Sequence, residues 1–235
     1  MNELPHNTEL AGSKRDKVTI MLADDHPLLR EALRNVLEKE PDFEIVAEAS
    51  DGEETVRLAT EIIPHVVIMD ISMPKISGLE ATRQIKAKCP SIAVLVLTVH
   101  DDSEHILSIL EAGAAGYLTK SVFGKEVINA VRGVASGETV LAPLVSEKII
   151  KHALRYAAKP VSLGLGEKIT GRELEILRLA AYGMSNKDIA ERLELSLRTV
   201  KGYLQEVFSK LNVTSRTEAV ITALRSGIIT LDDIK

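Results

Sequence analysis

The chain has 235 residues, a net charge of −5 and 45% hydrophobic residues, enough apolar material for two cores of ordinary domain size. Its single cysteine, Cys89, excludes an intramolecular disulfide, and no apolar run approaches the ~18 residues that a membrane span requires. Because residues 1–16 are too polar to act as a signal peptide, we expect a cytoplasmic protein without a membrane partner.

The charge is unevenly distributed along the chain. Residues 17–136 hold 12 Lys/Arg and 19 Asp/Glu, a net of −7, whereas residues 168–230 hold 10 and 7, a net of +3. This asymmetry favours the C-terminal part as the place where a polyanion binds. Ordinary surface variation explains the same difference, so charge alone does not establish a nucleic-acid partner.

Residues 18–136 alternate between short apolar runs and amphipathic segments, which is typical of βα units around a parallel sheet. The apolar runs predict five strands: Val18–Ala23, Phe43–Ala49, Val66–Met69, Ala93–Leu97 and Gly116–Leu118. The segments with helical spacing predict five helices: Leu28–Leu37, Glu53–Glu61, Leu79–Lys88, Glu104–Ala112 and Lys125–Ala135. We therefore expect an α/β domain over residues 17–137, a five-stranded doubly wound parallel sheet, after a disordered N-terminal extension over residues 1–16.

The pattern loosens after residue 137. We expect a linker over residues 138–167 that contains one helix, Ser146–Ala158, whose apolar residues share a face. Residues 168–235 then form a small all-α domain of four helices: Arg172–Ala181, Lys187–Leu193, Leu197–Leu211 and Thr217–Ser226. The spacing of a helix cap is found at three helix starts: Thr170 with Glu173, Ser185 with Asp188, and Ser196.

Polar residues follow the predicted strands at their carboxyl ends. Asp24 and Asp25 follow the first strand, Asp70 the third, Thr98 the fourth and Lys120 the fifth. That edge of an open parallel sheet forms the ligand crevice, so these side chains should converge. Three carboxylates at one point repel each other unless a cation lies among them, and hard oxygen ligands suit Mg²⁺. Asp70 is then placed to accept a phosphoryl group, with Lys120 as a second cation and Thr98 as a hydroxyl donor.

These residues resemble the receiver domains of two-component response regulators over roughly residues 17–137. The resemblance is carried by Asp24-Asp25, Asp70-Ile71-Ser72-Met73-Pro74, Gly78, Thr98 and Tyr117-Leu118-Thr119-Lys120. It implies a flavodoxin-like fold and Mg²⁺ bound by Asp25, Asp70 and the backbone carbonyl of Ser72, with Asp24 assisting. It also implies that Tyr117 is a switch aromatic that turns inward when Thr98 moves toward the phosphoryl group. His26, beside the acid pair, is expected to be a solvated loop residue rather than a ligand.

The helical part contains a short helix, a tight turn at Glu194-Leu195-Ser196 and a longer helix. A helix presented in this way fits the major groove of DNA. The exposed side of the longer helix carries the candidate groove residues Arg198, Thr199, Lys201 and Gln205. Candidate phosphate contacts lie at helix N-termini, where backbone N–H groups are free: Ser185, Asn186, Lys187 and Ser196. A plain helical bundle with solvated charges explains the composition equally well.

A second resemblance favours DNA binding, because residues 168–230 are very similar to the LuxR-type helix-turn-helix. It is carried by Thr170-Gly171-Arg172-Glu173, Gly183-Met184-Ser185-Asn186-Lys187-Asp188-Ile189-Ala190, Ser196 and Thr199-Val200-Lys201. Joined to a receiver, this domain makes the chain resemble the NarL/FixJ-type response regulators. The resemblance implies base reading at Lys201, Gly202 and Gln205, although Gly202 offers no side chain and Gly171 stands where proline is common. Val220, Ala223 and Leu224 form either a dimer face or packing within the domain.

We therefore predict a regulator rather than an enzyme. A sensor histidine kinase phosphorylates Asp70 with Mg²⁺ present, and the protein, a homodimer when phosphorylated, then binds double-stranded DNA. An Asp-nucleophile phosphatase is the enzymatic alternative, but that chemistry commonly uses a second Asp where Ser72 stands. A receiver that acts without phosphorylation is disfavoured by the intact acidic site, and a ligand-sensing LuxR-type regulator is disfavoured because the receiver occupies the sensory position.

Overall fold

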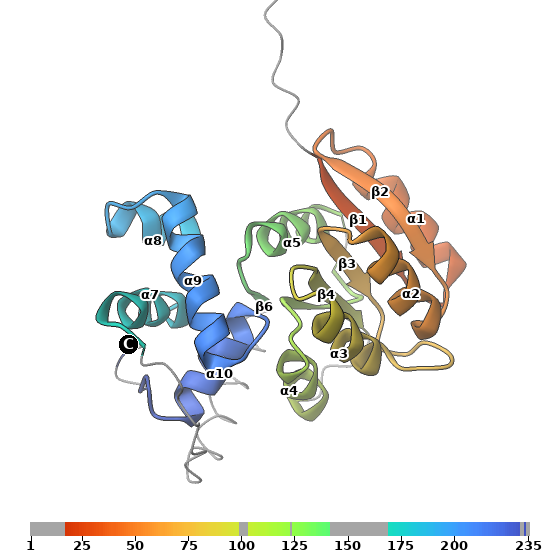
Figure 1. The fold of residues 1–235 in the computed structure, drawn as a ribbon. Coiled ribbons are helices and arrows are strands. Elements are labelled where there is room, and N and C mark those ends of the chain that lie inside the picture. The colour runs from red at the N-terminus through yellow and green to blue at the C-terminus, as the bar shows by residue number, and fades with distance from the viewer. Residues whose placement is uncertain (1–16, 99–102, 123, 142–168, 231–232, 234–235) are drawn as a thin grey trace, which may run out of the picture.

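The structure, a computed structural model, folds into two units that lie side by side (Figure 1). It describes residues 17–98, 103–122, 124–141, 169–230 and 233. The expected N-terminal extension, residues 1–16, and the expected linker helix, Ser146–Ala158, lie outside the described residues. Of the helices in the described part of the chain, none is long and apolar enough to span a bilayer.

The first unit is a parallel sheet in the order β2-β1-β3-β4-β5-β6. Its strands are β1 (Val18–Ala23), β2 (Phe43–Ala49), β3 (Val66–Met69), β4 (Ala93–Thr98), β5 (Gly116–Thr119) and β6 (Val140–Leu141). Its helices are α1 (Pro27–Leu37), α2 (Gly52–Ile62), α3 (Gly78–Lys88), α4 (Ser103–Glu111) and α5 (Lys125–Ser136). The five predicted strands and five predicted helices are confirmed.

Helices cover both faces of this sheet, which is why its central strands are almost continuously apolar. Along β1, Met21 and Ala23 point into a core shared with α2, α3 and α4. Ile20 and Leu22 point to the opposite side, into a core shared with α1 and α5. The sheet is therefore a buried central layer, and polar side chains reach solvent only at its edges and strand ends.

The sixth strand, β6, was not predicted. It lies in the segment that was expected to be a linker and pairs in parallel with β5, with Val140 opposite Gly116 and Leu141 opposite Tyr117. A strand of two residues has no periodicity that a sequence pattern can reveal. The sheet therefore continues beyond residue 137.

The second unit contains α7 (Gly171–Ala181), α8 (Asn186–Arg192), α9 (Leu197–Leu211) and α10 (Arg216–Arg225). The predicted caps are present: Thr170 and Ser185 form capping boxes, and Ser196 Oγ accepts a hydrogen bond from the N–H of Thr199 at 3.0 Å. The apolar face of α9 packs on α7, α8 and α10 through Val200, Leu204, Val207 and Leu211. This packing leaves the opposite side of α9 exposed.

Candidate functional site

The polar residues predicted at strand ends lie at one edge of the sheet. β1, β3, β4 and β5 are successive parallel neighbours, so their carboxyl ends meet there. The residues at these ends are Asp24, Asp25, Asp70, Thr98 and Lys120. Asp24, Asp70 and Thr98 are buried, whereas Asp25 and Lys120 are half-buried. The fold thus concentrates three carboxylates, a hydroxyl and an ammonium at one place.

Lys120 is the cation of this edge. Its Nζ lies 2.7 Å from Asp24 Oδ2 and 3.0 Å from Asp70 Oδ2. Burial lowers the pKa of Lys120, but the two carboxylates outweigh this effect and hold that pKa above its ordinary value. The ammonium is therefore charged at neutral pH and holds Asp24 and Asp70 together.

The carboxylates have the composition of a site for a hard cation. One ligand atom from each of Asp24, Asp25, His26 and Asp70 lies within 4.8 Å of the others. Asp25 Oδ1 and Asp70 Oδ2 are buried, and each lies close to one nitrogen group: His26 Nδ1 is 2.7 Å from Asp25 Oδ1, and Lys120 Nζ is 3.0 Å from Asp70 Oδ2. A single ammonium does not balance three clustered carboxylates, and Mg²⁺ binds carboxylate oxygens of this kind. His26 itself is exposed, as expected of a loop residue.

The loop after Asp70 has a tight path that depends on a glycine. The N–H of Ile71 donates to Asp70 Oδ1 at 2.8 Å and orients the carboxylate. At the end of the loop, the N–H of Gly78 donates to the carbonyl of Ile71 at 2.8 Å. A Cβ on Gly78 would lie 2.0 Å from the carbonyl oxygen of Asp70. Ser72 lies within this loop with its side chain exposed.

Replacing Gly78 by alanine is expected to slow phosphorylation of the protein by ~100-fold, because displacement of a reacting group by about 1 Å has an effect of this size. The added methyl group forces the backbone of Asp70 to move. Initial rates of labelling with a small phosphodonor measure the effect. Gly171→Ala is the matched control, since a Cβ there meets nothing within 4 Å. Equal rates for wild type and Gly78→Ala would contradict this prediction.

Sequence reasoning missed three residues that support the same loop. A Cβ on Gly52 would lie 2.1 Å from the carbonyl oxygen of Ile76, so α2 packs directly on the loop backbone. Lys75 has a positive φ of 66° and its Nζ lies 2.8 Å from Asp51 Oδ2. The backbone N–H of Glu54 and the ammonium of Lys75 lower the pKa of Asp51. In the sequence, Asp51 directly before Gly52-Glu53-Glu54 is typical of a helix start and does not indicate a contact with this loop.

Thr98 and Tyr117, the predicted switch pair, are both fully buried. Thr98 ends β4, and Tyr117 lies in the middle of β5 and packs in the core shared with α2, α3 and α4. The resemblance implied that Tyr117 turns inward after phosphorylation. In the structure Tyr117 already points inward. β6 pairs with β5 at Tyr117, so the strand that carries Tyr117 contacts the segment that leads out of this unit.

The predicted DNA contacts of the helical unit differ in exposure. The exposed members are Lys187, Ser196, Arg198, Thr199, Lys201, Gly202 and Gln205. Ser185 is half-buried, and its hydroxyl donates to Asp188 at 2.8 Å within the capping box. Asn186 is only 2% exposed. The structure therefore presents most of the predicted contacts on one side of α8 and α9, with Asn186 as the exception.

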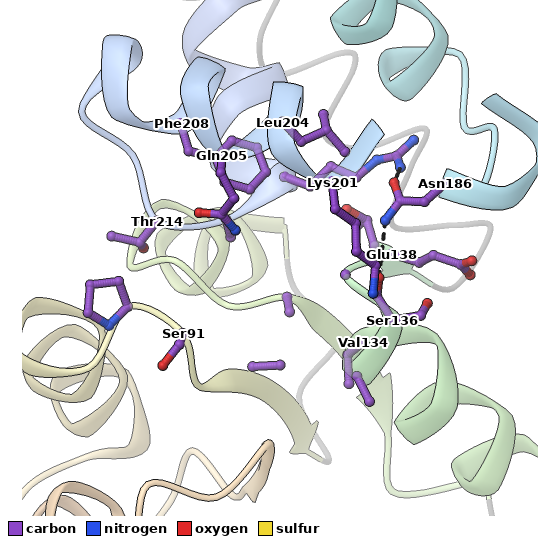
Figure 2. A pocket seen from close by; sticks show the side chains of 18 of the residues that line it. Ser91, Val134, Ser136, Glu138, Asn186, Lys201, Leu204, Gln205, Phe208 and Thr214 are labelled. Carbon is purple, nitrogen blue, oxygen red and sulfur yellow. Dashed lines mark hydrogen bonds between the residues drawn. The ribbon is translucent and has the colours of Figure 1, made fainter. Parts of the chain in front are cut away.

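The predicted base-reading side of α9 faces the first unit. Figure 2 shows Lys201 and Gln205 pointing from α9 into a cavity whose other wall includes Ser136 and Glu138. The cavity holds about 230 Å³. A DNA duplex, whose major groove alone is about 12 Å wide, does not fit into that space. Lys201 and Gln205 are exposed, but in this arrangement they face the narrow space between the two units.

Several direct contacts hold the units together. Glu111 at the end of α4 pairs with Arg225 of α10, with Oε1 and Nη2 separated by 2.6 Å. Thr139 Oγ1 and Thr217 Oγ1 are 2.9 Å apart. Ile221 of α10 is 3% exposed and belongs to the core of the first unit. The contact therefore combines apolar burial with polar pairs along α4, α10 and the segment after α5 (Figure 1).

The three apolar residues that were candidates for a dimer face pack within the helical unit. Ala223 is fully buried in its second core, and Val220 and Leu224 are partly buried against the same core. Of the two interpretations that the sequence left open, packing within the domain accounts for these side chains in the structure.

Lys86 of α3 lies at the edge of the same cavity and is an unusual buried amine. It is 4% exposed, and its Nζ donates to the carbonyl oxygens of Pro90 and Ile92. Burial lowers its pKa to about 8, which the negative charge of Glu218 opposes. The folded protein therefore binds fewer protons at Lys86 than the unfolded chain does between pH 8 and the ordinary pKa of 10.5.

The free energy of unfolding of the wild type is accordingly expected to rise relative to that of Lys86→Met between pH 8 and pH 10.5. The rise is up to about 3 kcal/mol, since each unit of pKa shift corresponds to ~1.4 kcal/mol. Denaturant unfolding of both proteins at pH 7, 8, 9 and 10 measures the difference. Because other groups titrate equally in both proteins, the comparison isolates Lys86. A difference that is independent of pH would show that Lys86 has an ordinary pKa.

Comparison with known proteins identifies both units. Residues 20–132 match the family described as the response regulator receiver domain, and residues 167–223 match the family described as bacterial regulatory proteins, luxR family. The chain is 39% identical to the uncharacterized transcriptional regulatory protein YxjL of Bacillus subtilis, over 92% of this chain and 99% of that protein. It is 38% identical to the transcriptional regulatory protein DegU of Brevibacillus brevis, over 90% of this chain and 95% of that protein.

Solved structures agree with these matches. A LuxR-family two-component response regulator from Aurantimonas is 37% identical, with a TM-score of 0.55 over 59% of this chain and 99% of that chain. The RcsB response regulator of Salmonella typhimurium is 25% identical, with a TM-score of 0.54 over 88% of this chain and 97% of that chain. The second match spans both units.

Proposed function

The chain belongs to the two-component response regulators of the NarL/FixJ type, with a receiver and a LuxR-type DNA-binding domain, and we propose that Asp70 is its phosphoacceptor. The observation that carries this proposal is the placement of Asp70 at the end of β3, where the carboxylate is buried and its Oδ2 lies 3.0 Å from Lys120 Nζ. We assign residues 17–141 to the receiver, because β6 belongs to its sheet, 142–167 to the linker and 168–235 to the DNA-binding domain.

The proposed reaction is in-line transfer of a phosphoryl group from a histidine kinase. An Asp70 carboxylate oxygen forms a bond to phosphorus as the bond between phosphorus and the donor nitrogen breaks. Lys120 neutralises charge on the transferred oxygens, and the hydroxyl of Thr98 donates to one of them. Asp24, Asp25, Asp70 and the Ser72 carbonyl would hold Mg²⁺, which would supply further positive charge for the transfer.

The proposed output is transcriptional regulation through α9. Lys201 and Gln205 read bases, and Arg198 and Thr199 contact the groove or its phosphates. Lys187 and the N-terminal residues Ser185 and Ser196 contact phosphates, while Gly202 leaves one reading position without a side chain. Phosphorylation separates the two domains and allows two copies to pair on DNA. The position of Lys201 and Gln205 at the cavity between the two domains supports this order of events.

The proposal is tested with the full-length protein, acetyl phosphate and Mg²⁺, followed by intact mass measurement. Wild type is expected to gain one phosphoryl group and Asp70→Ala none. Glu61→Gln, which removes an exposed carboxylate of α2, is the control and should be labelled like wild type. Equal labelling of wild type and Asp70→Ala places the site elsewhere. Steady hydrolysis of a phosphomonoester that depends on Asp70 would support a phosphatase instead.

A further inference from the structure

Asn186 behaves unlike the other predicted DNA contacts. It is the first residue of α8 and is 2% exposed, although its neighbour Lys187 is exposed. A buried carboxamide must satisfy two donors and an acceptor, so its partners show what the residue does in this arrangement.

The two ends of this carboxamide bind different domains. Its Oδ1 accepts a hydrogen bond from Arg216 Nη1 at 3.0 Å, within the DNA-binding domain. Its Nδ2 donates to the carbonyl oxygen of Ser136 at 3.1 Å, at the end of α5 in the receiver. Figure 2 shows Asn186 between the two domains, with both hydrogen bonds drawn.

Arg216 fixes Asn186 independently of the receiver. Besides Asn186, its guanidinium donates to the carbonyl oxygens of Ala180, at 2.9 Å, and Met184. Both carbonyls lie at the end of α7 and in the turn before α8, so all three hydrogen bonds lie within the DNA-binding domain. The side chain of Arg216 is buried. The Oδ1 end of Asn186 is therefore held whether or not the receiver is docked.

The receiver approaches Asn186 through its backbone. Gly137 caps the C-terminus of α5 with a φ of 87°, and a Cβ at that position would lie 3.3 Å from Asn186 Nδ2. The left-handed glycine turns the chain so that the carbonyl of Ser136 meets the amide. When the domains separate, this N–H donor loses its acceptor and faces the space in which Lys201 lies.

We propose that the Nδ2 amide of Asn186 is shared between two acceptors, the Ser136 carbonyl when the receiver is docked and a DNA phosphate oxygen when it is not. Receiver docking and DNA binding then compete for one donor, and Arg216 is the positioning residue that presents it in both states. The inference rests on the proposed function, because it assumes that the exposed side of α8 and α9 binds DNA. A phosphate oxygen suits this donor because amide side chains commonly contact the DNA backbone and the neighbouring Lys187 adds positive charge.

Asn186→Asp tests the shared donor. The aspartate keeps an oxygen for Arg216 but replaces the N–H donor with an oxygen that repels both the carbonyl and a phosphate. Binding of the full-length variant to a duplex selected by phosphorylated wild type is measured with and without acetyl phosphate. The affinity of the phosphorylated variant is expected to fall at least tenfold, through loss of a hydrogen bond to a charged group. The ratio of phosphorylated to unphosphorylated affinity is expected to shrink about fivefold, because docking is weakened as well.

Thr139→Val is the matched variant. It removes the hydroxyl that pairs with Thr217 across the same interface and leaves Asn186 in place. Its ratio of phosphorylated to unphosphorylated DNA affinity is also expected to shrink about fivefold. The phosphorylated variant should bind DNA as wild type does, and the unphosphorylated variant should bind more tightly than wild type. Asn186→Asp and Thr139→Val should therefore both weaken docking of the receiver, but only Asn186→Asp should weaken DNA binding.

Three results would decide the matter against the proposal. If phosphorylated Asn186→Asp binds DNA with unchanged affinity, Asn186 does not contact DNA. If its ratio of phosphorylated to unphosphorylated affinity equals that of wild type, Asn186 does not contribute to receiver docking. A fall in both affinity and unfolding temperature with a wild-type ratio indicates a structural role only. If the phosphodonor does not change the affinity of wild type, the proposed function itself fails, and this result is distinct from the other three.

Discussion

Replacement of Asp70 by asparagine is expected to abolish the response of DNA binding to a phosphodonor. Asparagine keeps the shape of the side chain but offers no carboxylate oxygen to form the bond to phosphorus. In wild type, phosphorylation is expected to raise DNA affinity by ~5- to 150-fold, the usual range of coupling between two sites. The variant should show no increase. Fluorescence anisotropy with a labelled duplex, before and after acetyl phosphate, measures both values.

Two controls make this result specific to Asp70. Glu61→Gln removes a carboxylate that lies on the exposed surface of α2, and its response should equal that of wild type. Unfolding by denaturant shows whether the asparagine variant is folded. A phosphodonor response that persists in Asp70→Asn would assign the regulation to another residue.

Reversal of the charge at Glu111 is expected to open the closed arrangement without phosphorylation. Glu111→Arg replaces the 2.6 Å pair with Arg225 by two like charges. A partly exposed pair contributes up to about 1 kcal/mol, and repulsion of similar size makes the total change 1–2 kcal/mol. The affinity of the unphosphorylated protein for DNA should therefore rise about tenfold, because apparent affinity scales with the open fraction. Affinity after phosphorylation should stay as in wild type.

The charge swap supplies the control. Arg225→Glu alone should also open the protein, whereas the double variant, Glu111→Arg with Arg225→Glu, restores opposite charges and should close it again. Comparing the double variant with Arg225→Glu separates docking from any direct effect of Arg225 on DNA. If the double variant binds DNA as tightly as the single variants do, the ion pair does not hold the domains together.

The architecture of each domain could be predicted because its determinants are local and periodic. Apolar runs define β1, β3 and β4, and polar residues directly after the strands locate Asp24, Asp70 and Lys120 at the same sheet edge. The caps at Thr170, Ser185 and Ser196 likewise depend on residues only three positions apart. Such short-range patterns can be recognised in the sequence without knowledge of the tertiary structure.

Contacts between the domains could not be predicted in the same way. Asn186 was predicted to contact DNA phosphates from a helix start, whereas the structure buries it between Arg216 and the docked receiver. Lys86 lies on a polar position of the α3 pattern, yet it is buried at the domain boundary. Lys75 lies in the left-handed region and pairs with Asp51, which is distant in sequence. These features arise from tertiary packing, which the sequence pattern does not encode locally.

The short strand β6 has a consequence for the construction of chimaeric regulators. In a chimaera joined at the end of α5, residues of another regulator would replace Thr139, Val140 and Leu141. The last two form β6, which completes the receiver's sheet beside Tyr117. The resulting hybrid would retain its phosphorylation chemistry but join it to an output domain through a foreign edge strand. A junction after Leu141 keeps this edge with its own receiver, and such hybrids should differ from the first kind in signal transmission while their labelling remains equal.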